Sequence, residues 1–518
     1  MAMTILFTPD DLAAFAEASR DVNPLHSNVA YARATAFGEP VVYGALAALK
    51  SLRHLPPRPR QSMATLLTEF RSPLFANVSY EIDCEHSPSQ SVLKVKDGRR
   101  LLLRVVATFV DKPLTSEPKA IFTHGAIDTC EPAVLTVDDM GEGMLFSGLY
   151  APDPVATRAL LGSLHLPDRG VAESQAAGLL ACSYLVGMRI PGRNALFYSA
   201  KLDWTAPPCE LAAGTYSAQI AALHKPLGLV TLRATFGSPL ALSAELKSFV
   251  RQPIRRPSPN ASLLPQKALE GRVAVVIGAS RGLGAAIAEA LAYAGATVIG
   301  TYLHSRETIA ELSDRLRSER AIFEAKQADA TDASEMTTLT EDVTRRHGGI
   351  DLLVCTACPP LHPLSIDRPS RDRILRHISD SLALVVTPMS CMLESVQSRR
   401  GAILLLSSSA VENPPAEWPH YVAAKRAIEG LAEVAAVSHK AVRIWLARPP
   451  KLLTELINTP LGRQGAADPG AYAAAVVSAL IAAQESPELG LRIVTSQRPV
   501  RTEQMGELSR CGRPYADF

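Results

Sequence analysis

The chain has 518 residues, of which 53 are basic and 51 acidic, giving a formal net charge of +2. This length exceeds a single ordinary core and indicates roughly two to four domains. The basic residues are scattered and aromatic residues make up only 5%, so no nucleic-acid or membrane-surface binding is indicated. No secretory signal or membrane-spanning run is apparent, and the eight cysteines fit reduced thiols, so we expect a cytoplasmic protein without a metal site.

The first candidate site is a short polar loop between two predicted helices. It reads S-R-D-V-N-P-L-H from Ser19 to His26, and an apolar helix is predicted to follow from Val41 to Leu49. Asn-Pro favours an extended turn, which can hold the carboxylate of Asp21 and the imidazole of His26 toward one point. Such a pair can orient a water molecule and move its proton. Alternatively, the two side chains only cap and hydrogen-bond the turn.

This loop also matches a family signature. Asp21, Asn23, Pro24 and His26 form the pattern D-x-N-P-x-H, which resembles the MaoC-like (R)-specific enoyl-thioester hydratases of the hot-dog fold. The sequence F-R-S-P at residues 70–73 fits the strand that follows in that family. The resemblance implies binding of an acyl thioester carried by coenzyme A or by an acyl carrier protein.

The same resemblance implies a role for each matching residue. Asp21 and His26 would activate water, and Asn23 would contribute to substrate binding. A backbone N–H near Gly44, at the start of the predicted apolar helix, would polarise the thioester carbonyl. Members of the family usually carry histidine before that glycine, whereas this chain has Tyr43.

The middle of the chain, residues 113–250, has no second acid-and-base loop. Its apolar patterns predict helices at 154–164 and 172–185 and strands at 196–204, 214–223 and 229–236. A helical pattern followed by strands repeats the organisation of residues 1–112, so we predict a second hot-dog unit without a catalytic loop. The alternative is a generic α+β scaffold. Proline, serine and arginine at residues 251–270 then predict a semi-rigid linker.

A strand, a turn and a helix are predicted from Val273 to Gly284, where the sequence reads V-A-V-V-I-G-A-S-R-G-L-G. Gly278, Gly282 and Gly284 stand where larger side chains would keep the backbone away from a pyrophosphate. The helix that follows offers its N–H groups and positive dipole end to that anion. Alone, this pattern fits an ordinary strand-turn-helix equally well.

Downstream residues supply the parts for hydride transfer to or from a carbon that bears oxygen. Residues 402–409 read A-I-L-L-L-S-S-S, a buried-strand pattern that ends in hydroxyls. Tyr421 and Lys425 share one helix face, where the ammonium would lower the pKa of the phenol. Ser408 could hold a substrate carbonyl oxygen, and its spacing to Tyr421 favours it over the serines on either side. Taken alone, Tyr421 and Lys425 also fit an exposed helical pair.

Together these motifs resemble a short-chain dehydrogenase/reductase. The resemblance rests on the glycine turn, on A-D-A at residues 328–330, on Ser408 and on Tyr421-x-x-x-Lys425. It implies an α/β Rossmann-type doubly wound parallel sheet in residues 271–518, and members of this family commonly form homo-oligomers, as dimers or tetramers. The predicted fold of the whole chain is therefore an α+β double hot-dog followed by this Rossmann-type sheet.

The family's roles carry over onto the matching residues. Tyr421 would donate or accept the proton, Ser408 would polarise the carbonyl, and Lys425 would hold the nicotinamide ribose. Asp329 would contact the adenine. The full set of expected cofactor contacts is Gly278, Ser280, Arg281, Gly282, Leu283, Gly284, Asp329, Ala330, Ala357, Tyr421 and Lys425.

The cofactor can be narrowed to one of the two nicotinamide dinucleotides. NAD-selective members place a carboxylate at the tip of the second strand to bind the ribose hydroxyls. Here the strand predicted at 297–302 is followed by L-H-S-R without a carboxylate, and Arg281 in the glycine turn suits a 2′-phosphate. We therefore expect NADP rather than NAD.

Both modules on one chain suggest consecutive reactions, because a 3-hydroxyacyl thioester is both the hydratase product and the dehydrogenase substrate. We predict an NADP(H)-dependent 3-oxoacyl/(3R)-hydroxyacyl reductase coupled to an (R)-3-hydroxyacyl dehydratase or enoyl hydratase. A second hypothesis keeps only one module active, since Tyr43, Cys358, Ser381 and Pro450 depart from the family patterns. A third, a scaffold that binds NADP without chemistry, fits less well because binding alone needs no proton donor. Acyl chain length, carrier and direction stay open.

Overall fold

The structure, a computed structural model, describes residues 3–111, 131–204, 212–254, 256, 258–460, 462–483, 491–495 and 501–502. The chain divides into two units, the first formed by residues 1–253 with the short segments 367–370 and 458–464, the second by the remainder. The predicted boundary between residues 112 and 113 lies outside the described residues. Within the described ranges, no helix has the length and apolar character that crossing a bilayer requires.

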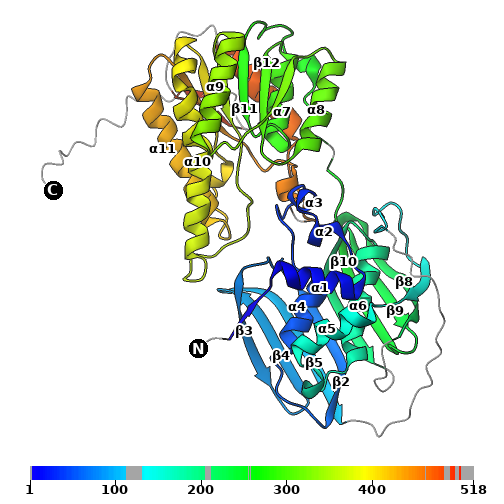
Figure 1. Cartoon of the computed structure of the whole chain (residues 1–518). Coiled ribbons are helices and arrows are strands. Elements are labelled where there is room, and N and C mark those ends of the chain that lie inside the picture. The colour runs from blue at the N-terminus through cyan, green and yellow to red at the C-terminus, as the bar shows by residue number, and fades with distance from the viewer. Residues whose placement is uncertain are drawn as a thin grey trace, which may run out of the picture. The chain divides into compact units, whose positions relative to one another are not determined.

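One antiparallel sheet of ten strands forms the framework of the first unit (Figure 1). The strands are β1 (Thr4–Leu6), β2 (Gln61–Phe70), β3 (Ser79–His86), β4 (Gln90–Asp97), β5 (Arg100–Asp111), β6 (Leu145–Tyr150), β7 (Ala195–Trp204), β8 (Gly214–His224), β9 (Leu229–Phe236) and β10 (Leu242–Val250). Their order across the sheet is β1-β3-β4-β5-β2-β7-β10-β9-β8-β6. The two halves therefore follow one pattern, and β2 pairs with β7 where they meet.

Each half of this sheet has its own buried helix. α4 (Gly44–Leu52) precedes β2 and α6 (Glu173–Tyr184) precedes β7, and both helices bury nearly all their side chains. α1 (Pro9–Ser19) and α5 (Pro154–Leu164) pack beside them (Figure 1). Because the strands alternate buried and half-exposed residues, as β10 does, one face of the sheet packs on the helices.

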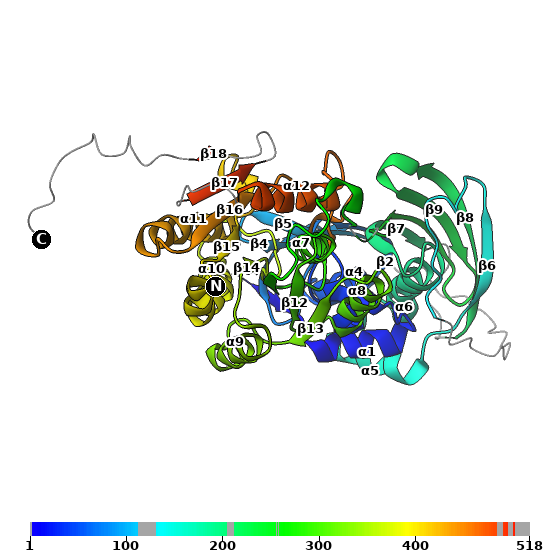
Figure 2. The same cartoon turned by 90° about the horizontal axis from the view of Figure 1, so that it is seen from above.

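The second unit is a mostly parallel sheet of eight strands between two layers of helices (Figures 1 and 2). The strands are β11 (Val273–Ile277), β12 (Thr297–Tyr302), β13 (Phe323–Gln327), β14 (Leu352–Cys355), β15 (Ala402–Leu406), β16 (Arg443–Arg448), β17 (Leu491–Thr495) and β18 (Arg501–Thr502). Their order is β13-β12-β11-β14-β15-β16-β17-β18, and only β18 runs antiparallel to its neighbour. This confirms the predicted doubly wound parallel sheet.

Helices cover both faces of this second sheet. α7 (Gly282–Tyr293), α8 (Arg306–Ser318) and α12 (Pro469–Ala482) contribute to one core cluster, and α9 (Ala333–His347), α10 (Arg371–Ser398) and α11 (Pro419–Ser438) contribute to the other. β11 and β15 are therefore buried along their whole length. The strand order reverses between β11 and β14, and open sheets of this kind bind ligands at the carboxyl ends of the strands beside such a reversal.

The predicted linker at 251–270 is only partly a tether. A short 3₁₀ helix spans Ala261–Leu263, and the two leucines that follow, Leu264 and Leu269, are 4% and 5% exposed. Both belong to the core cluster formed with α7, α8 and α12. Because apolar side chains gain free energy by leaving water, the last residues of this segment pack as part of the second unit.

Candidate active sites

The polar loop of the first unit follows α1, and two short helices, α2 (Pro24–Ser27) and α3 (Val29–Arg33), lie between α1 and α4. Asn23 has non-helical backbone angles (φ −55°, ψ 123°), and its side chain accepts a hydrogen bond from the Leu25 N–H. It thereby caps α2 (Pro24–Ser27), which starts at proline because the first helical residue needs no N–H. The loop thus places Asp21 before the cap and His26 within the turn.

Asp21 is a buried carboxyl group that is only 1% exposed. One of its oxygens accepts a hydrogen bond from Ser183 Oγ at 2.7 Å, and the other accepts one from the Asn23 N–H at 3.1 Å. Burial raises the pKa of Asp21 to about 6, although both hydrogen bonds oppose the shift. This carboxyl group can therefore exchange a proton close to neutral pH.

His26 is held in one tautomer. Its Nδ1 lies 2.7 Å from the Val41 carbonyl oxygen. Since a carbonyl only accepts, Nδ1 carries the hydrogen and Nε2 presents its lone pair. Burial, opposed by this hydrogen bond and assisted by the charge of Arg251, lowers the pKa of His26 to about 4. The imidazole is therefore neutral at pH 7 and can accept a proton at Nε2.

Tyr43 contacts both members of the pair. Its ring stacks on the His26 ring, with the centroids 3.8 Å apart and the planes 27° from parallel. Its hydroxyl donates a hydrogen bond to the backbone carbonyl of Asp21 at 2.8 Å, and the side chain is only 1% exposed. Tyr43, the residue that departs from the MaoC-like pattern, thus contacts the ring of His26 and the backbone of Asp21. The Asp21 carboxylate itself is hydrogen-bonded to Ser183 and to the Asn23 N–H.

The second half of the first unit supplies the partners of this loop, which the sequence did not reveal. Ser183 lies in α6, and a π-helical segment, Leu185–Arg189, continues that helix. The carbonyls of Gly187 and Gly192 accept hydrogen bonds from Asn23 Nδ2 at 3.0 and 3.1 Å. A Cβ added at Gly187 would lie 2.6 Å from both carboxylate oxygens of Asp21. Such π-helical bulges inside helices are frequent at functional sites, but nothing in the sequence pattern marks one.

Gly44, the predicted source of the carbonyl-binding N–H, begins α4. The residue before it, Tyr43, provides no side-chain cap, so its side chain satisfies none of the first-turn N–H groups. A Cβ at Gly44 would lie 3.0 Å from the ring of Phe70, which explains why glycine stands there. Phe70 is the last residue of β2, so the expectation that F-R-S-P continues as a strand is wrong after its first residue.

In the second unit, the three glycines of the turn differ in what an added Cβ would meet. Gly278 (φ +85°) follows β11, and a Cβ there would lie 3.0 Å from the Ala357 backbone. A Cβ at Gly284 would lie 2.2 Å from the Gly278 carbonyl oxygen and 2.4 Å from Thr356 Oγ1. Only Gly282 (φ +57°) has nothing closer than 3.6 Å. Gly278 and Gly284 are therefore required by close packing of the protein itself, and the role of all three glycines beside a pyrophosphate stays a prediction.

The three serines after β15 have separate partners. Ser408 hydrogen-bonds to the phenol of Tyr421, and its Oγ also accepts a hydrogen bond from the Ala410 N–H at 3.2 Å. Ser407 instead donates to Glu429 at 2.6 Å, and Ser409 begins a 3₁₀ turn. Ser408 is therefore the serine of the three that hydrogen-bonds to Tyr421, as the spacing predicts.

Tyr421 and Lys425 lie on α11, with the Lys425 Nζ 5.5 Å from the centroid of the Tyr421 ring. Lys425 is only 7% exposed and donates a hydrogen bond to the Leu406 carbonyl at 2.9 Å. Burial raises the pKa of the Tyr421 phenol, the Cys358 thiol adds to the rise, and the Ser408 hydrogen bond opposes it. The expectation of a phenol pKa lowered by the ammonium is therefore wrong here, because burial is the largest influence and Lys425 is not among the groups that shift this pKa. Burial also lowers the pKa of Lys425.

Three positions depart from the dehydrogenase pattern, and one of them lies near this pair. Cys358 is exposed, and its thiol is close enough to influence the pKa of both Tyr421 and Lys425. Ser381 lies on α10 and is 5% exposed, and Pro450 is the second residue after β16. In the described part of the chain, no group of three or more His, Cys, Asp or Glu side chains could hold a metal ion.

The remaining expected cofactor residues also follow the carboxyl ends of the strands. Asp329 comes after β13, and one of its carboxylate oxygens accepts hydrogen bonds from the Thr331 N–H and hydroxyl at 2.8 and 2.7 Å. The Ala357 N–H donates to the Ile277 carbonyl at 3.1 Å. Arg281 precedes α7 and gives it no side-chain cap. The others of the predicted set are Ser280 before that helix, Leu283 within it, and Ala330 after β13.

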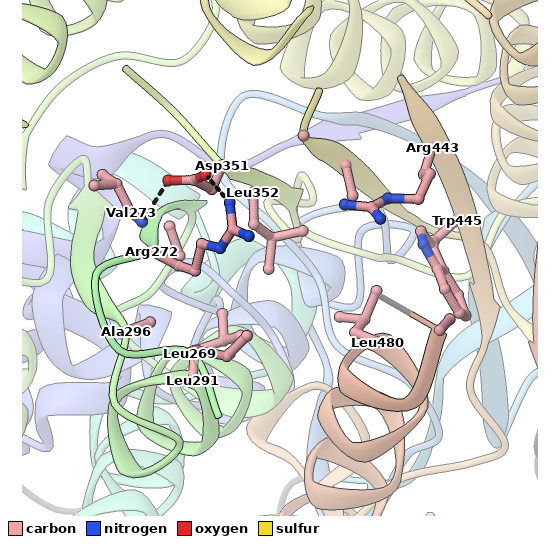
Figure 3. Close-up of a pocket in the computed structure, with 14 residues that line it drawn as sticks. Leu269, Arg272, Val273, Leu291, Ala296, Asp351, Leu352, Arg443, Trp445 and Leu480 are labelled. Carbon is pink, nitrogen blue, oxygen red and sulfur yellow. Dashed lines mark hydrogen bonds and ion pairs between the residues drawn. The ribbon is translucent and has the colours of Figure 1, made fainter. Parts of the chain in front are cut away.

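A cavity of about 40 Å³ lies at the amino ends of the strands of this sheet (Figure 3). It is lined by Val273, Leu352, Ala402 and Arg443, which are the first residues of β11, β14, β15 and β16. Asp351 accepts hydrogen bonds there from the Val273 N–H and from Arg272. Because Tyr421, Ser408 and the glycine turn lie past the other ends of these strands, this cavity is separate from the candidate site.

Comparison with known proteins assigns both parts of the chain. The short chain dehydrogenase family matches residues 272–460, and the MaoC like domain matches residues 2–71. A 3-oxoacyl-[acyl-carrier-protein] reductase, FabG, of Vibrio harveyi is 30% identical over 40% of this chain and 89% of its own length. The D-threitol dehydrogenase of Mycolicibacterium smegmatis is 29% identical over 36% of this chain and 73% of its own length.

Among solved structures, a dehydrogenase/reductase from Sinorhizobium meliloti 1021 is 23% identical, with a TM-score of 0.40, and is matched over 45% of this chain and 95% of its own. The chain therefore belongs to the short-chain dehydrogenase family through its C-terminal part and carries a MaoC-like domain at its N-terminal end.

Proposed function

We propose that this chain is a bifunctional acyl-thioester enzyme that uses one intermediate in two sites. The dehydrogenase part would interconvert 3-oxoacyl and (3R)-hydroxyacyl thioesters with NADP(H), and the MaoC-like part would interconvert the (3R)-hydroxyacyl and trans-2-enoyl forms. The observation that carries the proposal is that each part holds acid-base groups, since Asp21 and His26 both contact Tyr43 and Tyr421 is hydrogen-bonded to Ser408. The printed name of the Vibrio harveyi relative supports the 3-oxoacyl substrate.

The first unit would work as a double hot-dog, with residues 1–112 and 113–250 as its two halves and residues 251–270 as a linker. The repeated strand order and the two buried helices, α4 and α6, support this reading. In such a pair, one half would carry the reacting loop and the other would position it. The hydrogen bond from Ser183 to Asp21 supports this, because a residue of the second half there positions a residue of the reacting loop.

In hydration, His26 would take a proton from the attacking water, and Asp21 would hold that water in place. The free lone pair of His26 Nε2 can take that proton while the water oxygen bonds to C3 of the enoyl thioester. A proton then returns to C2, so that the elements of water are added overall. The Asp21 carboxylate would hold the water, and an N–H at the uncapped start of α4, near Gly44, would stabilise the thioester oxygen as it gains charge.

In reduction, Tyr421 would give its phenolic proton to the carbonyl oxygen while Ser408 donates a hydrogen bond to that oxygen. The nicotinamide, when bound, would supply the hydride to the carbonyl carbon. The residues present fit a dinucleotide: a Cβ at Gly282 would meet nothing closer than Thr454 at 3.6 Å, and α7 starts there without a side-chain cap, so its first N–H groups suit a pyrophosphate. The loop after β12 carries no carboxylate that would bind the ribose hydroxyls of NAD. Arg281, in the glycine turn before α7, offers a positive charge to the 2′-phosphate of NADP, so we favour NADP over NAD.

We further propose a homo-oligomer that forms through α10 and α11. Apolar side chains on these helices are exposed, with Val386 at 44%, Val434 at 65% and Val437 at 50%. Light scattering coupled to size exclusion would test this, and a monomeric mass at micromolar concentration would contradict it.

A second candidate function keeps one module active and the other as a binding scaffold. The observation that favours it is that Cys358, Ser381 and Pro450 differ from the residues usual at these positions of the dehydrogenase family. An idle dehydrogenase part would leave hydration intact and show no oxidation of NADPH with any 3-oxoacyl thioester.

The experiment that separates these functions combines two assays on one preparation. NADPH oxidation with a 3-oxoacyl thioester reports reduction, and mass detection of the enoyl product formed from a supplied (3R)-hydroxyacyl thioester reports dehydration. We expect Asp21→Asn to abolish only dehydration and Tyr421→Phe to abolish only reduction. Absence of both activities in the unmodified chain would contradict the proposal.

A further inference from the structure

The cavity at the amino ends of the strands of the second unit combines apolar walls with two guanidinium groups. Its walls include large apolar side chains from α7, α12, β16 and the segment before β11, namely Leu291, Leu480, Trp445 and Leu269. Arg272 and Arg443 line it as well, and in Figure 3 the Arg443 side chain extends toward Arg272. We call this site the arginine cavity.

The register of the sheet explains why basic and aromatic side chains gather on one face. Arg443 and Trp445 are two residues apart in β16, so they share the face of the sheet that α7 and α12 cover. Arg492 of β17 is the direct partner of Trp445, and its guanidinium lies 5.4 Å from the centroid of the indole ring. The neighbouring strand therefore adds a further positive charge beside Arg443.

The carboxylate at this cavity already has other partners. Asp351 is 7% exposed, and one of its oxygens accepts a hydrogen bond from Arg272 at 2.9 Å. The other oxygen accepts from the Val273 N–H at 3.0 Å and from Arg399 at 3.2 Å. Among the described residues that line the cavity, Asp351 is the one carboxylate. Two guanidinium groups therefore share its single charge before Arg443 is counted.

Arg443 has no counter-charge in the part of the chain that the structure describes. Its side chain donates a hydrogen bond to the Arg400 carbonyl at 3.3 Å, and it forms no ion pair there. Burial and the charges of Arg272 and Arg492 lower the pKa of Arg443. A half-buried cation beside other cations costs free energy unless an anion compensates it. The charges at this end of the sheet therefore favour an anion.

We propose that the arginine cavity binds a short-chain carboxylate, with its charged group between Arg272 and Arg443 and its alkyl chain against the leucines of α7 and α12. A planar guanidinium matches the two oxygens of a carboxylate, and apolar walls gain free energy by covering methylene groups. The volume of about 40 Å³ has room for roughly three water-sized groups, which is comparable with acetate or propionate. Phosphate suits these walls less well, because all its oxygens need polar partners. Binding here requires neither of the two proposed reactions.

The first test uses the unmodified chain and ligands that differ in one property. Line broadening of ¹³C-labelled propionate in NMR spectra at low ionic strength reports binding, and we expect a Kd of about 1 mM. Propionamide has the same shape without the charge and should bind roughly 10-fold more weakly or less. Inorganic phosphate should not displace propionate at equal concentration. Equal binding of propionate and propionamide, or displacement by phosphate, would overturn the proposal.

Substitutions then locate the binding. Arg443→Gln should weaken propionate binding roughly 10-fold or more, because charge-assisted hydrogen bonds are lost. Arg317→Gln removes the same charge from a guanidinium on α8 that is 74% exposed and outside the cavity. This control should bind propionate within about twofold of the unmodified chain, since distant surface charges are screened. Equal losses in both variants would show a general charge effect and contradict the site.

Thermal unfolding distinguishes a ligand site from a purely structural arginine. The last turns of α7 and α12 line the cavity, so Arg443 could serve only to balance their negative carbonyl ends. Arg443→Gln would then lower the thermal midpoint, and propionate would stabilise nothing. We expect instead that, without propionate, the variant unfolds no lower than the unmodified chain, because repulsion from Arg272 and Arg492 is relieved.

Saturating propionate should raise the midpoint of the unmodified chain by roughly 2 °C or more, because a ligand stabilises the state that binds it. The midpoint of Arg443→Gln should not respond, and that of Arg317→Gln should rise like the unmodified chain. A lowered midpoint in Arg443→Gln, together with no response of the unmodified chain to propionate, would overturn the proposal.

Discussion

Asp21 and Tyr421 are the groups that we propose to react in the two units, and burial raises the pKa of both, yet the chain holds them in different ways. Asp21 receives its hydrogen bond from Ser183, which belongs to the other half of the sheet. Tyr421 receives its support from Ser408 and Lys425, the neighbours that its motif predicts. The first site is thus assembled from distant parts of the chain, whereas the second is assembled from one strand end and one helix.

The two candidate sites also differ in how many of their buried polar groups are hydrogen-bonded. Both oxygens of Asp21 have protein partners, and Asn23 is held by two carbonyls of the second half. The nitrogens of His420, the residue before Tyr421 on α11, by contrast have no partner among the described residues. Polar groups with all their hydrogen bonds made are held in one geometry. The two sites therefore differ in how fully the protein fixes their polar side chains.

The largest predicted effect is that of Tyr421→Phe. Removing the phenolic proton should lower 3-oxoacyl reduction roughly 10³-fold, because general acid catalysis is lost while the ring still fills its place. Hydration by the first unit should be unchanged, which spectrophotometric assay of an enoyl thioester checks. Loss of both activities would mean that the two sites are not independent.

The next effect tests the contribution of the second half to the first site. Gly187→Ala places a Cβ 2.6 Å from both Asp21 oxygens, so the carboxylate has to move. We expect hydration to fall about 100-fold, as small displacements of reacting groups commonly cost that much. Gly162→Ala in α5 is the matched control, because a Cβ there meets nothing within 4 Å. Equal rates for the two variants would contradict the assembled site.

A smaller effect concerns the cofactor. Arg281→Ala should weaken NADPH binding about 10-fold by removing a charge suited to the 2′-phosphate. Binding of NADH, which lacks that phosphate, should change little, and fluorescence titration with both nucleotides measures the difference. An equal loss for both nucleotides would point to a structural role of Arg281 in the turn.

The smallest effect is a shift in pH dependence. The Ser183 hydrogen bond stabilises the carboxylate of Asp21 and so lowers its pKa. In Ser183→Ala the pKa should rise above its value of about 6, which leaves more of the group protonated near neutral pH. Hydration needs the carboxylate, so its acid limb should move to higher pH, with a loss of roughly 3-fold at pH 6. A limb that stays in place would show that Ser183 does not tune Asp21.

The elements and site residues that the sequence predicts are those encoded by local motifs. The strand at Thr297–Tyr302 and the helix at Pro154–Leu164 have the predicted bounds, because each has an uninterrupted period and clear end signals. The serine chosen by its spacing to Tyr421 is the one that hydrogen-bonds to it. The start of α4 was predicted too early, since Val41 instead bridges to Phe75.

Contacts between distant segments account for what the sequence could not predict. Ser183 and Gly187 lie in an apolar run that reads as core, and only the fold brings them to Asp21. The pKa of Tyr421 depends on how deeply the helix is covered, which no motif encodes. The pairing of His377 with His420 likewise follows from the packing of α10 on α11.

The most direct test of the central claim supplies the shared intermediate itself. A (3R)-hydroxyacyl thioester is incubated with the full chain, with and without NADP⁺, and the products are followed by mass spectrometry. The account predicts an enoyl product, by loss of water, in both mixtures and a 3-oxoacyl product, by loss of two hydrogens, only with NADP⁺. Formation of neither product, or of only one in the presence of NADP⁺, would contradict the claim that two working sites share one intermediate.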